Sequence, residues 1–317
     1  MDKTSKKGLA VLILVGLAAI LLGLYKLNFT QKNTWEDSNS FSSKSLSPKK
    51  FNFRANSKPY IAVLHINGVI QEANQTYNQD WLLNTIRTLK NDDKNLGILL
   101  YIDSPGGTVY HADEAYLTLL DYKTTGKSVY AYFGPMAASG GYYIGCAADK
   151  IYANRNGLTG SIGVISASFV DATGLLEKLG LKSMTIHAGK NKNMLNFNES
   201  ATDEQIAIMQ SLADECYEQF TQIVSLSRKM KIEYVKTLAD GRVYSALQAK
   251  ENGLIDDVVS IGKAKELIRT DFNDNSLLFK NYKYDRPESL RSLLMESFSF
   301  IKNPQSAYNG GNILFYM

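Results

Sequence analysis

Short apolar runs alternate with amphipathic segments over most of the chain. Runs in which both alternating sets of side chains are apolar predict strands that are buried on both faces of a sheet. Five such runs occur, at residues 60–66, 97–103, 128–133, 150–153 and 183–186. Between two of them, the apolar residues of 109–120 share one face of a predicted helix. This alternation predicts an α/β domain with largely parallel strands and crossover helices.

A longer amphipathic helix is predicted to begin at Thr202. Thr202 and Gln205 have the spacing of a capping box, and apolar residues then recur at helical intervals as far as Ile223. We expect this stripe to pack into the core, with Cys216 as a buried and inert thiol. Cys146 is the only other cysteine, so no disulfide framework is expected.

The apolar run nearest the N-terminus has the length of a membrane span. Gly8 to Tyr25 are 18 residues without a charge, which is near the minimum for crossing a bilayer. No small-x-small pattern follows the run, so an uncleaved signal anchor is favoured over a cleavable signal. The lysines before the run favour a cytoplasmic N-terminus and an exported remainder. We expect a single-pass protein of the cell membrane whose folded domain is extracytoplasmic.

These patterns divide the chain into four parts. Residues 1–27 are the predicted cytoplasmic N-terminus and transmembrane signal anchor, and residues 28–58, rich in Ser, Asn and Lys, are a flexible polar tether. Residues 59–271 are the folded domain. Residues 272–317 are a C-terminal extension with an apolar end, which we expect to contact its own domain, a neighbouring copy or a substrate groove.

Composition narrows the possible partners. The 317 residues are 44% hydrophobic and 21% charged, as in an ordinary globular protein. The formal charge of +4 is spread thinly, without the dense basic run of a nucleic-acid surface. We therefore expect no nucleic-acid partner, and we expect neither a cofactor nor a metal.

The run from Met136 to Tyr143 carries the main candidate for chemistry. It holds Ser139 among alanines and glycines, whose small side chains let a peptide approach the serine oxygen. Such a run is more often a packing contact between helices. A second glycine element, Asp103-Ser104-Pro105-Gly106-Gly107, follows another predicted strand and precedes a helix capped by Thr108. Backbone N–H groups in such a turn can stabilise an oxyanion, so Ser139 is a candidate nucleophile.

A nucleophilic serine needs a base. His65 lies within a predicted strand, and neither His65 nor His187 lies in a catalytic sequence pattern. His111 follows the Gly-Gly loop, so a Ser-His-Asp triad stays open as an alternative. Lysine serves instead where a desolvated pocket lowers its pKa from about 10.4 towards neutrality. Lys190 and Lys192 lie in one predicted loop, where solvated surface lysines are the plainer interpretation.

The order of three motifs resembles the signal peptide peptidase A (protease IV) family, an S49-type serine peptidase family. The first two are the glycine element at 103–107 and the serine run at 137–143, and the third is Leu158-Thr159-Gly160-Ser161-Ile162-Gly163-Val164. The similarity continues through 240–249 and covers about residues 60–260. It implies a membrane-anchored Ser-Lys peptidase on the Clp protease/crotonase-like fold of repeated β-β-α units.

The resemblance also implies roles for individual residues. Ser139 corresponds to the nucleophile, and Lys192, in a Gly-x-x-Lys element, to the general base. Gly107 and Gly140 would donate oxyanion N–H groups, and Ser161 would orient the lysine amine. One position departs from the family, because a Ser-Pro-x-Arg-like segment after the lysine is replaced by residues 196–199, Asn-Phe-Asn-Glu. The departure leaves Lys190 as the alternative base.

One copy of each motif implies the half-length form of the family, which assembles into a homo-oligomeric ring and completes its dyad between adjacent copies. The implied substrates are hydrophobic peptides such as remnant signal peptides. Two alternatives stay open: a crotonase-like acyl-CoA enzyme and a non-catalytic membrane scaffold of the same fold. Labelling of Ser139 by a fluorophosphonate would favour the peptidase over both.

Overall fold

The computed structural model describes residues 58–286 of the chain. The predicted anchor at residues 8–25, nearly all of the tether and the C-terminal residues 287–317 lie outside the described residues. Of the helices between residues 58 and 286, none combines the length and the apolar composition that a bilayer crossing requires.

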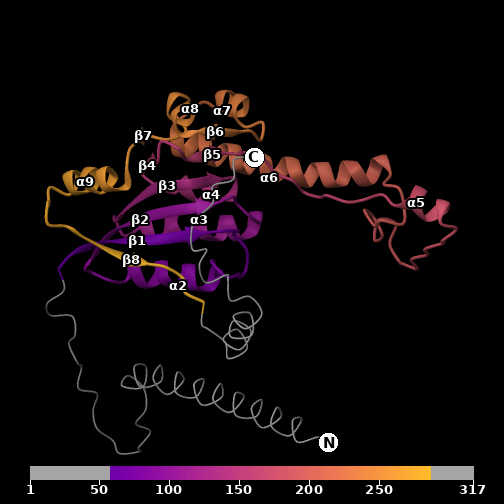
Figure 1. Ribbon diagram of the computed structural model, residues 1–317, viewed down its shortest axis with the longest axis horizontal. Helices are drawn as coiled ribbons and strands as arrows, with labels where there is room; N and C mark the ends of the chain where they lie inside the picture. Colours follow the sequence, from indigo (N-terminus) through magenta and orange to yellow (C-terminus); the bar gives the residue numbers. More distant parts are fainter. Residues whose placement is uncertain (1–57, 287–317) are drawn as a thin grey trace, which may run out of the picture. The chain divides into compact units, whose positions relative to one another are not determined.

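Eight strands within residues 58–286 form one sheet (Figure 1). Six follow the order β6-β5-β3-β2-β1-β8, while β4 pairs with β3 and β7 pairs with β4. All pairs are parallel except β5 with β6. The strands are β1 (Tyr60–Asn67), β2 (Asn95–Ser104), β3 (Ser128–Ala138), β4 (Lys150–Ala153), β5 (Leu158–Gly160), β6 (Val243–Ser245), β7 (Asp257–Val258) and β8 (Leu278–Tyr282).

Helices connect the parallel strands, as the alternation predicted. The helices of the described chain are α2 (Gln79–Lys90), α3 (Val109–Lys123), α4 (Gly140–Gly145), α5 (Thr173–Lys178), α6 (Asp203–Arg228), α7 (Ile232–Leu238), α8 (Ala246–Glu251) and α9 (Ile261–Asp271). The helix predicted over 109–120 is α3, and the capping box of Thr202 and Gln205 is present at the start of α6. Both helix predictions are confirmed.

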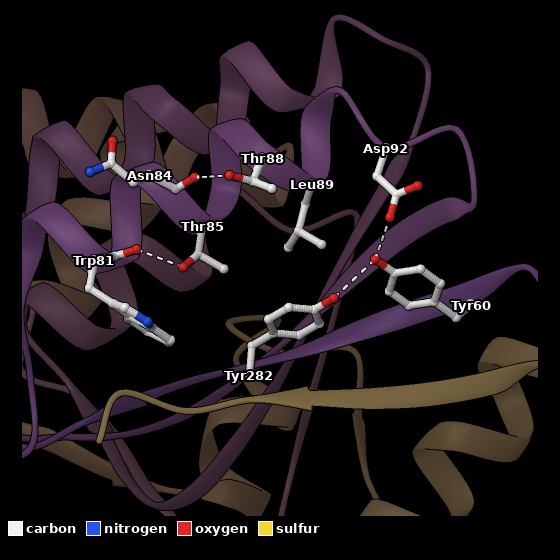
Figure 2. Close-up of a pocket in the computed structure, with 8 residues that line it drawn as sticks. All are labelled: Tyr60, Trp81, Asn84, Thr85, Thr88, Leu89, Asp92 and Tyr282. Atoms are coloured by element: carbon white, nitrogen blue, oxygen red, sulfur yellow. Dashed lines mark hydrogen bonds between the residues drawn. The ribbon is translucent and has the colours of Figure 1, made fainter. Parts of the chain in front are cut away.

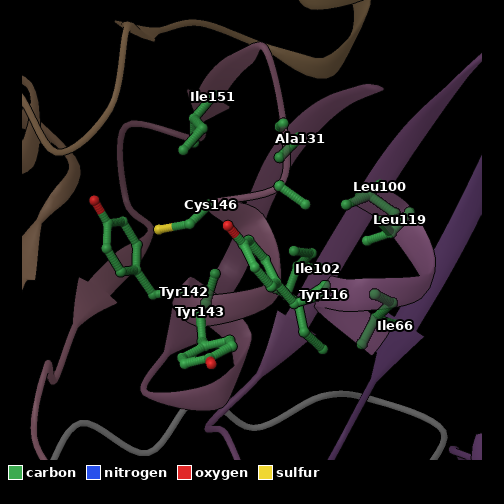
Figure 3. Close-up of a cluster of buried hydrophobic side chains, with 14 of the residues drawn as sticks. Ile66, Leu100, Ile102, Tyr116, Leu119, Ala131, Tyr142, Tyr143, Cys146 and Ile151 are labelled. Carbon is green, nitrogen blue, oxygen red and sulfur yellow. The ribbon is translucent and has the colours of Figure 1, made fainter. Parts of the chain in front are cut away.

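The sheet is buried on both faces, which explains the continuous apolar runs of its central strands. Along β1, the even-numbered residues Tyr60, Ala62, Leu64 and Ile66 join the larger core cluster, which includes residues of α2, α3 and α4. Figure 3 shows part of this cluster around Tyr116, Tyr142 and Tyr143. The odd-numbered Ile61 and Val63 face the other way and pack with Ala264 and Ile268 of α9.

Four of the five predicted strands are confirmed, and the strand predicted at residues 183–186 is wrong. That segment is irregular, and the side chains of Met184 and Ile186 are 85% and 93% exposed. Within residues 58–286 no strand pairs with it, so its backbone groups gain nothing from an extended ladder. The sheet also continues past residue 271, where the folded domain was predicted to end, because β8 pairs with β1.

The stripe of α6 enters the core only in its C-terminal half. Phe220, Ile223 and Val224 are buried, whereas Ile206 and Leu212 are about half exposed. Cys216 is partly exposed, so the prediction of a buried thiol is wrong there. The first half of α6 projects from the sheet and leads to α5 (Figure 1). We call residues 164–218, which include α5 and this half of α6, the arm.

A hollow of about 350 Å³ lies between α2 and β8 (Figure 2). Trp81 and Tyr282 line it, and Tyr60 donates a hydrogen bond to Asp92 at its inner end. It runs along α2 and reaches the amino end of β1 at Tyr60. None of its lining residues belongs to the glycine or serine motif, so this hollow is separate from them.

Candidate active site

Ser139 occupies a strained turn between β3 and α4. Its backbone has φ 51° and ψ −120°, a conformation that costs a residue with a side chain about 1–3 kcal/mol. Two hydrogen bonds hold the turn: the Ser139 N–H donates to the Gly160 carbonyl at 2.8 Å, and the Tyr143 N–H donates to the Ser139 carbonyl at 2.9 Å. Strand-to-helix turns of this kind present a nucleophilic serine at the top of a parallel sheet.

The glycine element lies beside Ser139 because β2 and β3 are neighbours, with Ser104 in register with Ala137. Gly106 has φ +106°, and a Cβ at this residue would lie 2.7 Å from the Ser139 Cβ. A Cβ on Gly107 would lie 1.9 Å from the Ile70 carbonyl oxygen. Only glycine fits at either position, so the two glycines are required for the loop to approach the serine.

The N–H groups of Gly107 and Gly140 come from backbone segments in close contact. A Cβ built on Gly140 lies 3.3 Å from the Gly107 nitrogen. Neither N–H donates a hydrogen bond to any residue of the described chain. Neighbouring backbone donors without an internal partner are available to stabilise a developing oxyanion.

Ser161 lies next to Ser139 at the carboxyl edge of the sheet. It directly follows β5, whose Gly160 is in register with Ala138 of β3. Ser161 also has a positive φ of 49°, and its N–H donates to the Arg242 carbonyl at 2.8 Å. Four of the five predicted site residues therefore meet at one edge of the sheet: Gly107, Ser139, Gly140 and Ser161.

Lys192 is the fifth predicted residue, and one chain does not bring it to Ser139. It lies exposed on the arm, and its side chain makes no hydrogen bond or ion pair with the described residues. The neighbouring Lys190 forms an ion pair with Glu204 on the first turn of α6, and Asn191 donates to Glu204 at 3.3 Å. The hydrogen bond from Lys190 lowers the pKa of Glu204. Lys190 is thus engaged in holding the loop on α6, which leaves Lys192 as the better candidate base.

No histidine of the described chain is hydrogen-bonded to Ser139. His65 contacts Asn281 at 3.3 Å and lies against the Tyr101 ring, His111 contacts the Thr108 hydroxyl at 2.5 Å, and His187 contacts the Gly189 carbonyl. Each ring therefore has a local role, and the triad alternative gains no support.

Two features of the site were missed from the sequence. The first is the strain at Ser139, for which the flanking glycines are only an indirect signal. The second is the apolar surface of the arm, because Met184 and Ile186 were predicted in a buried strand and Ile206 and Leu212 in a core stripe. Exposed apolar residues on the arm are Ile165, Phe169, Val170, Leu175, Leu179, Leu181, Met184, Ile186, Phe197, Ile206 and Leu212.

Two family profiles match this chain. Residues 121–273 match the profile of Peptidase family S49, and residues 66–174 match that of Clp protease. The second match, together with the mainly parallel sheet, confirms the predicted Clp protease-like α/β fold.

Three relatives illustrate the similarity. The chain is 37% identical over 205 residues to a protein of Enterococcus faecium named "Putative signal peptide peptidase SppA", covering 62% of this chain and 59% of that protein. It is 36% identical to a Synechocystis protein named as a putative protease, covering 64% and 71%. It is 32% identical to the chloroplastic serine protease SPPA of Arabidopsis thaliana, covering 64% and 30%. The match therefore spans less than two thirds of the Enterococcus and Arabidopsis proteins.

Proposed function

Because this chain belongs to peptidase family S49, we propose that it is a serine endopeptidase whose nucleophile is Ser139 and whose general base is Lys192. The observation that carries the proposal is the strained serine beside two unpartnered N–H groups. A packing serine would gain nothing from a conformation that costs about 1–3 kcal/mol. For a nucleophilic serine, the same conformation holds the hydroxyl next to the oxyanion donors.

The reaction proceeds through an acyl-enzyme. Neutral Lys192 accepts the Ser139 proton as the serine oxygen attacks the peptide carbonyl, and the carbonyl oxygen becomes the oxyanion. The N–H groups of Gly107 and Gly140 donate to that oxygen. The protonated lysine gives its proton to the leaving amine, and then activates the water that releases the acyl group. Ser161 accepts a hydrogen bond from the lysine amine and orients it.

The lysine reaches the serine from an adjacent copy of the chain. Two observations support this part of the proposal: Lys192 lies on the arm, and the arm exposes many apolar side chains. Ile165 and Met184 are both 85% exposed, which is costly for an isolated chain in water. A second copy packed on the arm would cover these apolar side chains, and repetition of the contact would close a ring.

The substrates we propose are hydrophobic peptides, including signal peptides released from precursor proteins. The E. faecium relative is named as a signal peptide peptidase, which supports this class. We further propose that residues 8–25 anchor the chain in the cell membrane with the N-terminus in the cytoplasm and the peptidase domain outside. A domain tethered in this way works where cleaved signal peptides accumulate.

The test uses the full-length chain with synthetic signal peptides, and the fragments are identified by mass spectrometry. Ser139→Ala should abolish cleavage, whereas Ser183→Ala, at an exposed serine of the arm, should retain it. Equal mixtures of Ser139→Ala and Lys192→Ala chains should recover part of the activity. Cleavage by purified Ser139→Ala chain would refute the nucleophile, and a fully active monomer would refute the shared dyad.

A further inference from the structure

Tyr143 connects three helices one turn after the candidate nucleophile. Its hydroxyl donates to Asp113 Oδ1 of α3 at 2.6 Å, and Gln219 Nε2 of α6 donates to the Tyr143 oxygen at 2.6 Å. Gln219 also donates to Asp113 at 3.1 Å, which closes the triangle. Burial, reinforced by the Asp113 contact, raises the pKa of Tyr143, so the hydroxyl keeps its proton at neutral pH.

The Tyr143 ring is held as firmly as its hydroxyl. It is 4% exposed, and its centroid lies 5.0 Å from the Phe220 ring of α6 and 5.5 Å from the Tyr116 ring of α3. Figure 3 shows the rings of Tyr116 and Tyr143 together beside the start of α4. The side chain therefore ties the helix that begins at Ser139 to one position on α6.

That position is where α6 leaves the core. Phe220, Thr221, Ile223 and Val224 are buried, whereas Ile206, Leu212 and most residues between them are exposed. From Gln219 back to Asp203 the helix runs about 24 Å at 1.5 Å per residue. Glu204, in the first turn, holds the lysine loop through Lys190 and Asn191. The direction of α6 at Gln219 thus determines where the loop bearing Lys192 lies.

We propose that Tyr143 is a positioning residue that sets the direction of the arm and hence the place at which a chain presents Lys192 to its neighbour. The inference rests on the proposed shared dyad. A tilt of about 5° at Gln219 moves the start of α6 by about 2 Å over that length. Misplacement of a catalytic group by about 1 Å can reduce turnover about 100-fold, so even a small loss of restraint at Tyr143 matters.

The first test measures the direction of the arm directly. Nitroxide labels are attached at Arg87→Cys on α2 and Glu177→Cys on α5 in the full-length Cys216→Ser chain, diluted in unlabelled chain. Tyr143→Phe should shift or broaden the label distance by about 2 Å or more. Tyr116→Phe is the matched control, because the Tyr116 hydroxyl makes no hydrogen bond with the described residues while its ring contacts Tyr143. An unchanged distance distribution in folded Tyr143→Phe chain overturns the proposal.

The second test separates an effect through the arm from an effect on the serine. In mixtures of Ser139→Ala and Lys192→Ala chains, the former supply the lysine and the latter supply the serine. Tyr143→Phe placed in the Ser139→Ala chain should lower kcat about 10- to 100-fold with little change in KM. The same substitution in the Lys192→Ala chain should cost much less. Equal losses in both arrangements, or a larger loss in the Lys192→Ala chain, overturn the positioning role.

The two tests distinguish failure of this inference from failure of the proposed function. Mixtures without Tyr143→Phe that show no activity refute the shared dyad, and the label distances then still decide whether Tyr143 directs the arm. Active mixtures combined with unchanged distances leave the shared dyad standing and refute the role of Tyr143.

Discussion

Replacing Ser139 with glycine should stabilise the protein while abolishing its activity. The backbone of Ser139, at φ 51° and ψ −120°, costs a residue with a Cβ about 1–3 kcal/mol. Glycine adopts this conformation without strain but has about 0.5–1 kcal/mol more conformational entropy to lose on folding. The difference between these two ranges is about 0–2.5 kcal/mol, with a central value of about 1 kcal/mol in favour of Ser139→Gly. Ser139→Ala keeps the Cβ and therefore keeps the strain.

The comparison is made between the two inactive variants. For a domain of this size 1 kcal/mol moves the melting temperature by about 2–4 °C, so the central gain of about 1 kcal/mol should make Ser139→Gly melt about 2–4 °C above Ser139→Ala. Thermal unfolding is followed by circular dichroism at one fixed protein concentration, because assembly makes the midpoint depend on concentration. Both variants should fail to cleave peptides.

A matched pair of variants, Ser128→Gly and Ser128→Ala, should show a stability difference of the opposite sign. Ser128 begins β3 and is not among the residues with positive φ, so Ser128→Gly should be about 0.5–1 kcal/mol less stable than Ser128→Ala. If Ser139→Gly proves no more stable than Ser139→Ala, the turn is not strained, and the argument that chemistry maintains this conformation fails.

Two further predictions concern the core. The Lys127 ammonium donates to three carbonyl oxygens at the end of α2, at 2.9–3.0 Å. Lys127→Met should therefore lower the free energy of unfolding by about 1.5–3 kcal/mol, measured by thermal unfolding. Lys94→Met, at an exposed lysine, is the control and should leave it unchanged. Burial raises the pKa of Cys146 to about 12, which leaves roughly one thiol in 10⁴ ionised at pH 8. In a Cys216→Ser chain, Cys146 should therefore react with Ellman's reagent only after denaturation, and rapid labelling of the native chain would contradict its burial.

The central sheet could be predicted from sequence because its burial is local and two-sided. In β1, β2 and β3 both alternating sets of side chains face packed helices, so an unbroken apolar run has only one stable interpretation. The ends of the strands were less predictable. β8 carries Lys280 and Asn281 and lies at the edge of the sheet, where one side of the strand is unpaired and the apolar signal is weak.

The candidate site also has a part that could be predicted from the sequence and a part that could not. Glycines at 106, 107 and 140 follow buried strands that are neighbours in the sheet, so their meeting at one edge follows from the topology. The positive φ of Ser139 has no pattern of its own, because a serine between Ala138 and Gly140 fits a relaxed turn equally well. The place of Lys192 could not be predicted at all, since it depends on the direction of a helix that leaves the core.

Three errors of the sequence prediction carry information, because they lie together, apart from the misplaced domain end at residue 271. The absent strand at 183–186, the exposed half of the α6 stripe and the partly exposed Cys216 all belong to the arm. Burying apolar surface contributes about 25 cal/mol per Å² to stability, whichever molecule covers it. An apolar pattern therefore predicts that a surface is buried, but not whether the same chain or another chain buries it. Scattered errors would indicate weak signals. Three errors in the one segment that also bears Lys192, all at exposed apolar positions or beside them, indicate a surface whose cover is another molecule. If a neighbouring copy covers the arm, that contact explains both the exposed apolar residues and the solvated lysine. Substituting Met184 and Ile186 with serine should then abolish complementation between Ser139→Ala and Lys192→Ala chains while leaving each chain folded.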